Sequence, residues 1–182
     1  AQLLAMHSPH RIRSLLLTNC DTQNDCPPPS FKPIVALARA GGLANKVIAP
    51  ALADKAGARG PRGIGGLGYT DPRNPTDEAL EMYFAPIVSS EKRKAQFDAL
   101  TIGLGANALA ASAEKLRSVS SPVRMVWAMD DTVFARAGAE WLDHTLPQSR
   151  GLRIVEHAKL FFPEEQPDVI AAEARMLWNV RP

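Results

Sequence analysis

Short apolar runs alternate with longer amphipathic stretches along the chain, and three of these runs predict buried strands. They cover residues 13–19, 123–128 and 152–155, and turn-forming residues follow the first two. Continuous apolar runs, in contrast to alternating ones, are typical of parallel strands that helices cover on both faces. We therefore expect a parallel sheet built from these three segments.

Apolar residues at helical spacing predict helices between and after the strands. We expect residues 1–8 to be the end of an amphipathic helix that Pro9 stops, and residues 57–75, rich in glycine and proline, to hold no regular element. The other predicted helices cover residues 31–53 (interrupted at Gly41, Gly42 and Pro50), 76–88 with Thr76 as its cap, 91–100, 106–116, 134–146 and 163–178. Strand, helical insert, strand, helix, strand, helix predicts an α/β fold.

Composition and charge exclude several classes of protein. The chain has 182 residues, of which 46% are hydrophobic and 22% charged, as in an ordinary soluble domain. The net charge of +2, with scattered basic residues, gives no reason to expect a nucleic-acid partner. No apolar run approaches the ~18 residues that a membrane span needs. We expect neither a nucleic-acid nor a membrane partner.

The two cysteines, Cys20 and Cys26, are too few for a disulfide framework, and no histidine stands at zinc-ligand spacing from them. We expect free thiols in a cytoplasmic protein, although a bridge between the two remains geometrically open. We expect no metal and no cofactor. The sequence lacks an initiator Met and a signal peptide, and it starts within a predicted helix, so we expect a truncated chain.

Candidate chemistry gathers where the predicted strands end, because ligands of parallel sheets bind beyond the carboxyl ends of the strands. The three segments there are residues 19–21, 129–132 and 156–159, which offer Asp131 and His157. A histidine held by a carboxylate is the usual base of nucleophilic hydrolysis. Two simpler interpretations stay open: Asp131 as a helix cap ahead of Phe134, and His157 as a solvated loop residue.

A glycine run at residues 63–68 reads GIGGLG and formally matches the dinucleotide-binding pattern GxGxxG. No predicted strand precedes the run, no predicted helix opens from it, and no acidic residue ends a second strand about twenty residues later. We interpret it as a flexible loop.

Three segments carry a resemblance to a known family: residues 1–18 (AQLLAMHSPHRIRSLLLT), 126–131 (VWAMDD) and 161–168 (FFPEEQPD). They resemble the C-terminal part of an α/β-hydrolase-fold protein, of the branch near haloalkane dehalogenases, epoxide hydrolases and small esterases. In that family the first segment looks like the helix after the nucleophile elbow followed by the sixth strand, the second like the end of the seventh strand, and the third like the segment after the catalytic histidine. The resemblance implies a truncated α/β-hydrolase fold: core over 1–21, a helical cap over 22–110, and core again over 111–182.

The resemblance also implies roles for individual residues. It makes Asp131 the acid of a catalytic triad, with Asp21 after the first strand as the alternative acid. It places the nucleophile a few residues before Ala1, outside this chain. The family's usual register puts Leu160 at the histidine position, so either His157 serves as the base or the histidine is lost.

Two functions follow from these observations. The first is a hydrolase that acts on a small-molecule substrate, a largely apolar ester, epoxide or haloalkane, by a nucleophile–His–acid mechanism. The second is a non-catalytic binding or interaction protein, or an inactive fragment, with the same fold. The sequence does not indicate an oligomeric state.

Overall fold

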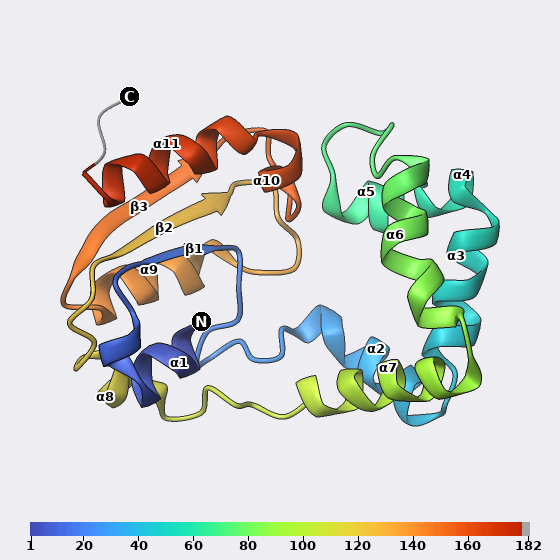
Figure 1. The fold of residues 1–182 in the computed structure, drawn as a ribbon, viewed down its shortest axis with the longest axis horizontal. Helices are drawn as coiled ribbons and strands as arrows, with labels where there is room; N and C mark the ends of the chain where they lie inside the picture. The colour runs from blue at the N-terminus through green and yellow to red at the C-terminus, as the bar shows by residue number, and fades with distance from the viewer. Residues whose placement is uncertain (180–182) are drawn as a thin grey trace. The chain divides into compact units, whose positions relative to one another are not determined.

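The computed structural model of the protein describes residues 1–179, which form two compact units. One unit contains Ala1–Cys26 together with the chain from Leu109 onward, and the other is Pro27–Ala108. The first unit holds the sheet, and the second consists of helices and connecting turns (Figure 1). The two are described separately below.

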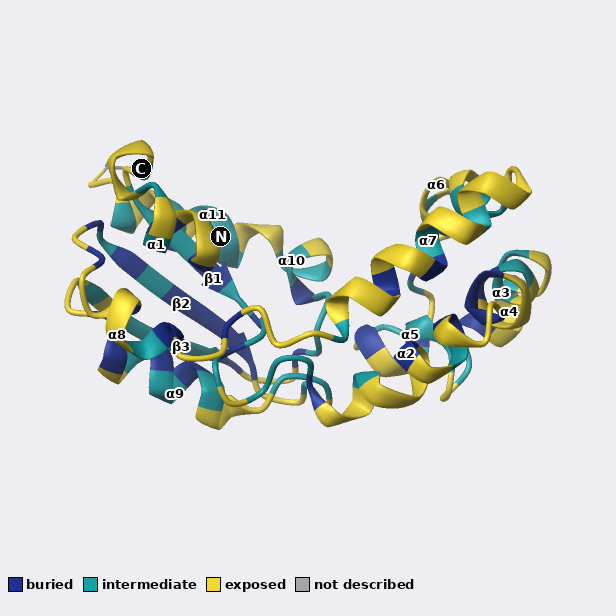
Figure 2. Ribbon diagram, turned by 90° about the horizontal axis from the view of Figure 1, so that it is seen from below, coloured by how far each residue is buried: buried dark blue, intermediate teal, exposed yellow. Residues whose placement is uncertain are grey.

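The sheet has three strands, β1 (Leu15–Thr18), β2 (Val123–Ala128) and β3 (Ser149–Val155), in the order β1-β2-β3. Both pairings are parallel, as the apolar runs predicted. The central strand β2 is almost wholly buried (Figure 2). Because all three strands run the same way, their carboxyl ends meet at one edge of the sheet.

Alternate residues of the strands face opposite layers of helices. On one face, Leu17, Met125 and Trp127 form a core with α1 (Gln2–His7), α8 (Ser112–Leu116) and α9 (Arg136–Thr145). On the other face, Val126 and Ala128 pack with α10 (Phe162–Glu165) and α11 (Pro167–Leu177). Figures 1 and 2 show α9 and α11 on opposite sides of the sheet. Burial on both faces explains why the strands are continuous apolar runs.

The second unit has its own core, formed by Ile48, Ala58, Leu80 and Phe84. Its main helices are α2 (Lys32–Arg39), the π-helical η3 (Ala44–Ile48), α3 (Ala49–Ala53), α4 (Lys55–Ala58), α5 (Ile64–Gly68), α6 (Asp77–Val88) and α7 (Glu91–Leu104). Two short 3-10 turns, η1 (Pro9–Arg11) in the first unit and η2 (Pro29–Phe31) in the second, complete the helical elements of residues 1–179. The predicted cap of α6 is confirmed, since Thr76 Oγ1 accepts a hydrogen bond from Ala79 N at 3.2 Å. Such caps satisfy N–H groups that the first turn of a helix leaves without partners.

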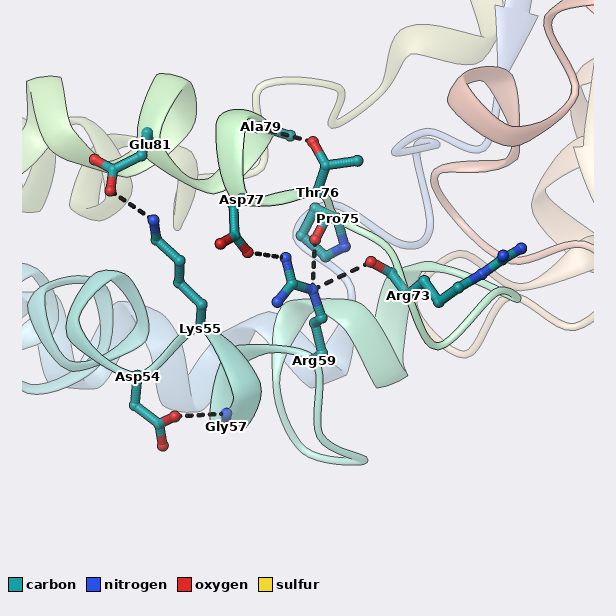
Figure 3. Close-up of polar contacts among 10 residues, drawn as sticks. All are labelled: Asp54, Lys55, Gly57, Arg59, Arg73, Pro75, Thr76, Asp77, Ala79 and Glu81. Carbon is teal, nitrogen blue, oxygen red and sulfur yellow. Dashed lines mark hydrogen bonds and ion pairs between the residues drawn. The ribbon is translucent and has the colours of Figure 1, made fainter.

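The prediction of no regular element between residues 57 and 75 was wrong. Here α4 and α5 are short helices. Arg59, directly after α4, donates from its Nε to Pro75 O (2.8 Å) and Arg73 O (3.1 Å) (Figure 3). The guanidinium also pairs with Asp77 at the start of α6. Residues without side chains let these backbones approach closely: a Cβ on Gly65 would lie 2.6 Å from Arg59 Cα. The glycines of this stretch allow two backbones to pack closely. Composition alone predicted a stretch without regular structure, because glycine is also common in loops.

Two predicted helices are shorter than expected. Of residues 106–116 only α8 is helical, because Ala111 has a left-handed backbone (φ 56°) and the chain passes between the units at Ala108–Leu109. The closing helix is divided at Gln166, the residue between α10 and α11. Pro167 follows at once, and proline disfavours a helical conformation in the residue before it.

Candidate functional site

The loops that follow β2 and β3 are joined by hydrogen bonds of the backbone. Met129 N donates to Val155 O, and Asp130 N donates to Ala158 O, each at 2.9 Å. These bonds extend the β2–β3 pairing past the ends of the strands. The segments that carry Asp131 and His157 are therefore held side by side at the carboxyl edge of the sheet.

The carboxylate of Asp131 is fixed by a partner on each oxygen. Its Oδ2 accepts from Asn19 Nδ2 at 2.5 Å, and its Oδ1 accepts from Val133 N at 2.7 Å. It is not the cap of α9, as one sequence interpretation held, because the N-cap position of that helix is Ala135. A half-buried acid restrained in this way presents a defined negative charge at the edge of the sheet.

Asn19 is a site residue that sequence reasoning missed. It is buried directly after β1, and besides Asp131 its side chain binds the backbone of β2: Oδ1 accepts from Ala128 N at 2.9 Å. The amide thus satisfies the last N–H of β2 and holds the carboxylate that follows that strand. The sequence did contain a signal for this contact: an amide stands directly after one predicted strand, and an acid stands shortly after the next strand of the sheet.

His157 lies in the loop after β3, exposed, with a left-handed backbone conformation (φ 52°). Such a conformation is uncommon for residues other than glycine, and strained positions of this kind concentrate at functional sites. It lies between the exposed Glu156 and the buried Ala158, whose carbonyl accepts the bond from Asp130 N. Phe162, which is fully buried at the start of α10, anchors the segment that follows.

Asp21, the alternative acid, has a different environment. Burial raises the pKa of its carboxyl above the ordinary value, and the charge of Asp25 adds to this, while a hydrogen bond with Cys26 opposes it. Asp21 follows β1, which β2 separates from β3. The loop that carries His157 is bonded to the segment of Asp131, which follows the neighbouring strand β2.

Cys20, next to Asp21, is a half-buried free thiol. Burial, with a smaller contribution from the charge of Asp21, raises the pKa of Cys20 to about 12. Gln2 Nε2 lies 3.6 Å from its sulfur and donates to Asp21 O at 2.7 Å. Because the thiolate is the reactive form, Cys20 is unsuited to act as a nucleophile.

The glycine run does not form a phosphate-binding loop. Gly63 N and Gly66 N both donate to Gly60 O, at 2.9 and 3.2 Å, and Leu67 N donates to Gly63 O at 3.1 Å. N–H groups engaged in this way are not available to cradle a phosphate. Within residues 1–179, no group of three or more His, Cys, Asp or Glu side chains is placed to hold a metal ion.

Comparison with solved structures identifies the fold. An α/β hydrolase from a Medee basin deep-sea metagenome library matches 100% of this chain over 61% of its own length (13% identity, TM-score 0.66). A 2-hydroxy-6-oxo-6-phenylhexa-2,4-dienoate hydrolase from Rhodococcus sp. strain RHA1 matches 97% of this chain over 59% of its own length (14% identity, TM-score 0.68). A serine hydrolase from Cycloclasticus zankles matches 98% of this chain over 59% of its own length (14% identity, TM-score 0.70).

The chain therefore has an α/β-hydrolase fold, and it spans about 60% of the length of these solved relatives. No protein-family model matches its sequence, and no curated protein matches it significantly. Among the helices of the described residues, none has the length and apolar character needed to cross a bilayer.

Proposed function

We propose that this chain supplies the base and the acid of a hydrolase with a nucleophile–His–acid mechanism, with His157 as base and Asp131 as acid. The observation that carries the proposal is the fixed carboxylate of Asp131, bound by Asn19 and Val133 N, on a loop bonded to that of His157. The fold shared with α/β hydrolases adds support. In this proposal Asp21 is not the acid.

The chemistry assigns one role to each group. His157 would take the proton of the nucleophile, or of a water that attacks a covalent intermediate, and return it to the leaving group. Asp131 would orient the imidazole and stabilise its protonated form. In this proposal the nucleophile would come from a segment that precedes Ala1. The encoding gene would show whether that residue is serine or aspartate.

The helical unit Pro27–Ala108 would act as the cap that selects the substrate. We propose a small, largely apolar ester, epoxide or haloalkane. A serine nucleophile would indicate ester hydrolysis through an acyl-enzyme, whereas an aspartate would favour opening of an epoxide or displacement of a halide. We propose a cytoplasmic enzyme that needs no cofactor.

The test is turnover of an ester, epoxide and haloalkane panel by the full-length protein and its His157→Ala variant. Loss of the base should lower kcat by several orders of magnitude, because the members of a triad act as a unit. His157 is exposed, so the variant should keep the parent's circular dichroism and melting temperature. His144→Ala, which removes an exposed imidazole on α9, is the matched control and should keep full activity. Full turnover by His157→Ala would exclude this base.

A non-catalytic binding protein is the second candidate, and the observation that favours it is Leu160 at the position where the family resemblance expects histidine. The structure leaves Leu160 half-buried three residues beyond His157. A full-length protein that melts cooperatively, binds members of the panel and turns none of them over would decide for this candidate.

A further inference from the structure

A cavity of ≈ 530 Å³ opens at the amino edge of the sheet, the edge opposite to Asp131 and His157. Its polar wall comes from the starts of β2 and β3, which contribute Arg124 and Arg150. Helix α11 and the residue before β2 contribute the rest of the lining, chiefly Pro122, Glu173, Met176 and Leu177. The cavity thus joins cationic and apolar surfaces in one unit of the protein.

The guanidinium of Arg124 is held rigidly in this wall. Its Nε donates to Glu173 Oε2 at 2.6 Å, and its Nη1 donates to Arg150 O at 2.7 Å. Arginine has five N–H donors in a fixed planar fork, so others remain for a ligand. A donor group that is already oriented loses little conformational entropy on binding, which favours recognition of a carboxylate or phosphate.

The only acidic side chain of the lining, Glu173, is already neutralised by its partners. It is 1% exposed, and its second oxygen accepts from Arg153 Nη1 at 2.8 Å. Burial alone would raise the pKa of Glu173, but hydrogen bonds from Arg124 and Arg153 outweigh it and hold that pKa below its ordinary value. Glu173 is therefore ionised at neutral pH, and each of its carboxylate oxygens accepts a hydrogen bond from an arginine.

Arg150 adds a further positive charge to the lining of the cavity. Among residues 1–179 it takes part in no ion pair, and its side chain is exposed. With Arg124 and Arg153 it sets three cations against the single carboxylate of Glu173. The surplus is concentrated beside the cavity, so the electrostatic potential there favours an anion.

We propose that this cavity binds a small organic anion. Its carboxylate or phosphate group would bind Arg124 and Arg150, and its apolar part would lie against Pro122, Met176 and Leu177. The volume falls in the range of about 300–1,000 Å³ typical of sites for small organic ligands, well above the size of a bare inorganic ion. The site is separate from the proposed catalytic edge, so it stands whether or not the hydrolase proposal holds.

The experiment is calorimetric titration of the full-chain protein with four probes: hexanoate, hexyl phosphate, 1-hexanol and inorganic phosphate. Hexanoate or hexyl phosphate should bind, with the tighter of the two identifying the head group, and 1-hexanol and inorganic phosphate should bind at least about tenfold more weakly. The backbone amide resonances of Arg150 and Leu177 should shift on titration. Equal affinity for 1-hexanol and hexanoate would overturn the proposal, and so would absence of binding by both anions.

Arg150→Gln is the diagnostic variant, because the side chain is exposed and its loss should leave the fold intact. It should weaken binding of the preferred anion by about tenfold, the typical effect of losing a hydrogen bond to a charged group. Arg117→Gln, which removes an exposed arginine after α8, is the matched control and should bind like the parent. Unchanged affinity in Arg150→Gln would contradict the proposed site.

Discussion

At the scale of single residues, the carboxyl edge of the sheet depends on one buried amide. Asn19 binds Ala128 N with its oxygen and Asp131 with its nitrogen, so a single side chain connects β1, β2 and the loop after β2. An amide suits this position because it donates and accepts at once. A carboxylate in its place could not donate to Asp131.

We predict that Asn19→Ala lowers the free energy of unfolding by about 1–3 kcal/mol, because Ala128 N and one oxygen of Asp131 lose their partner. Asn19→Asp should show a pH dependence, since two facing carboxylates raise the pKa of the pair. Its stability relative to the parent should then be greatest below about pH 4, the ordinary pKa of Asp in the unfolded chain, and fall as the pH rises through the raised pKa of the pair. Urea unfolding over a series of pH values from about 4 upward measures this, with the exposed amide variant Asn45→Ala as control.

Cys20 gives a second prediction at this scale. Because burial raises its pKa to about 12, from 9.0 for a free thiol, its thiolate fraction at pH 8 is about a thousandfold lower. Iodoacetamide at pH 8 should therefore modify Cys20 very slowly in the folded protein and readily in 6 M guanidinium chloride, as peptide mass spectrometry would report. Rapid alkylation of the folded protein at Cys20 would contradict the raised pKa of this thiol.

At the scale of elements, the glycines of the second unit have opposite roles that the structure distinguishes. A Cβ on Gly65 would lie 2.6 Å from Arg59 Cα and 2.7 Å from Asn74 O, whereas one on Gly103 in α7 would meet nothing within 4 Å. Gly65→Ala should cost about 1–3 kcal/mol through overpacking. Gly103→Ala should stabilise by about 0.5–1 kcal/mol, because alanine is the better helix former. Equal effects of the two substitutions in urea unfolding would contradict this account.

The sequence predicts the elements that depend on local patterns, and it misses those in a stretch with contacts between distant residues. The strands, α9 and the Thr76 cap are dictated by short-range patterns, such as apolar runs and a hydroxyl before acidic residues, and the structure has them. The stretch with α4 and α5 is different, because it contains contacts between residues distant in the sequence, such as those of Arg59 with residues 73–77, which no local pattern predicts.

The candidate site divides in the same way. That the segments of Asp131 and His157 lie at one edge can be predicted, because parallel strands bring their carboxyl ends together. The catalytic roles of the two residues stay predictions. The role of Asn19 depends on a hydrogen bond to a residue distant in the sequence. The left-handed backbone of His157 likewise has no signal in the residues around it.

At the scale of the whole molecule, β1 is an edge strand of the described sheet, since it pairs with β2 alone. Its sequence, LLLT, contains no charge and no proline, the usual means by which edge strands avoid pairing with other chains. We predict that the 182-residue chain associates in a concentration-dependent manner, and that it melts at a lower temperature than a longer form in which preceding strands cover this edge. Sedimentation velocity and thermal melting measure the two effects.

A charged residue on β1 distinguishes association through this edge strand from nonspecific association of the chain. Thr18→Lys, at the end of β1, should reduce association, because a lysine on an edge strand opposes pairing with a second chain. Ser118→Lys adds the same charge at an exposed position away from the strand, so it should leave association unchanged. If both variants reduce association equally, net charge and not the edge of β1 is responsible. A parent chain that stays monomeric and melts cooperatively would show that four edge residues are too few to drive pairing.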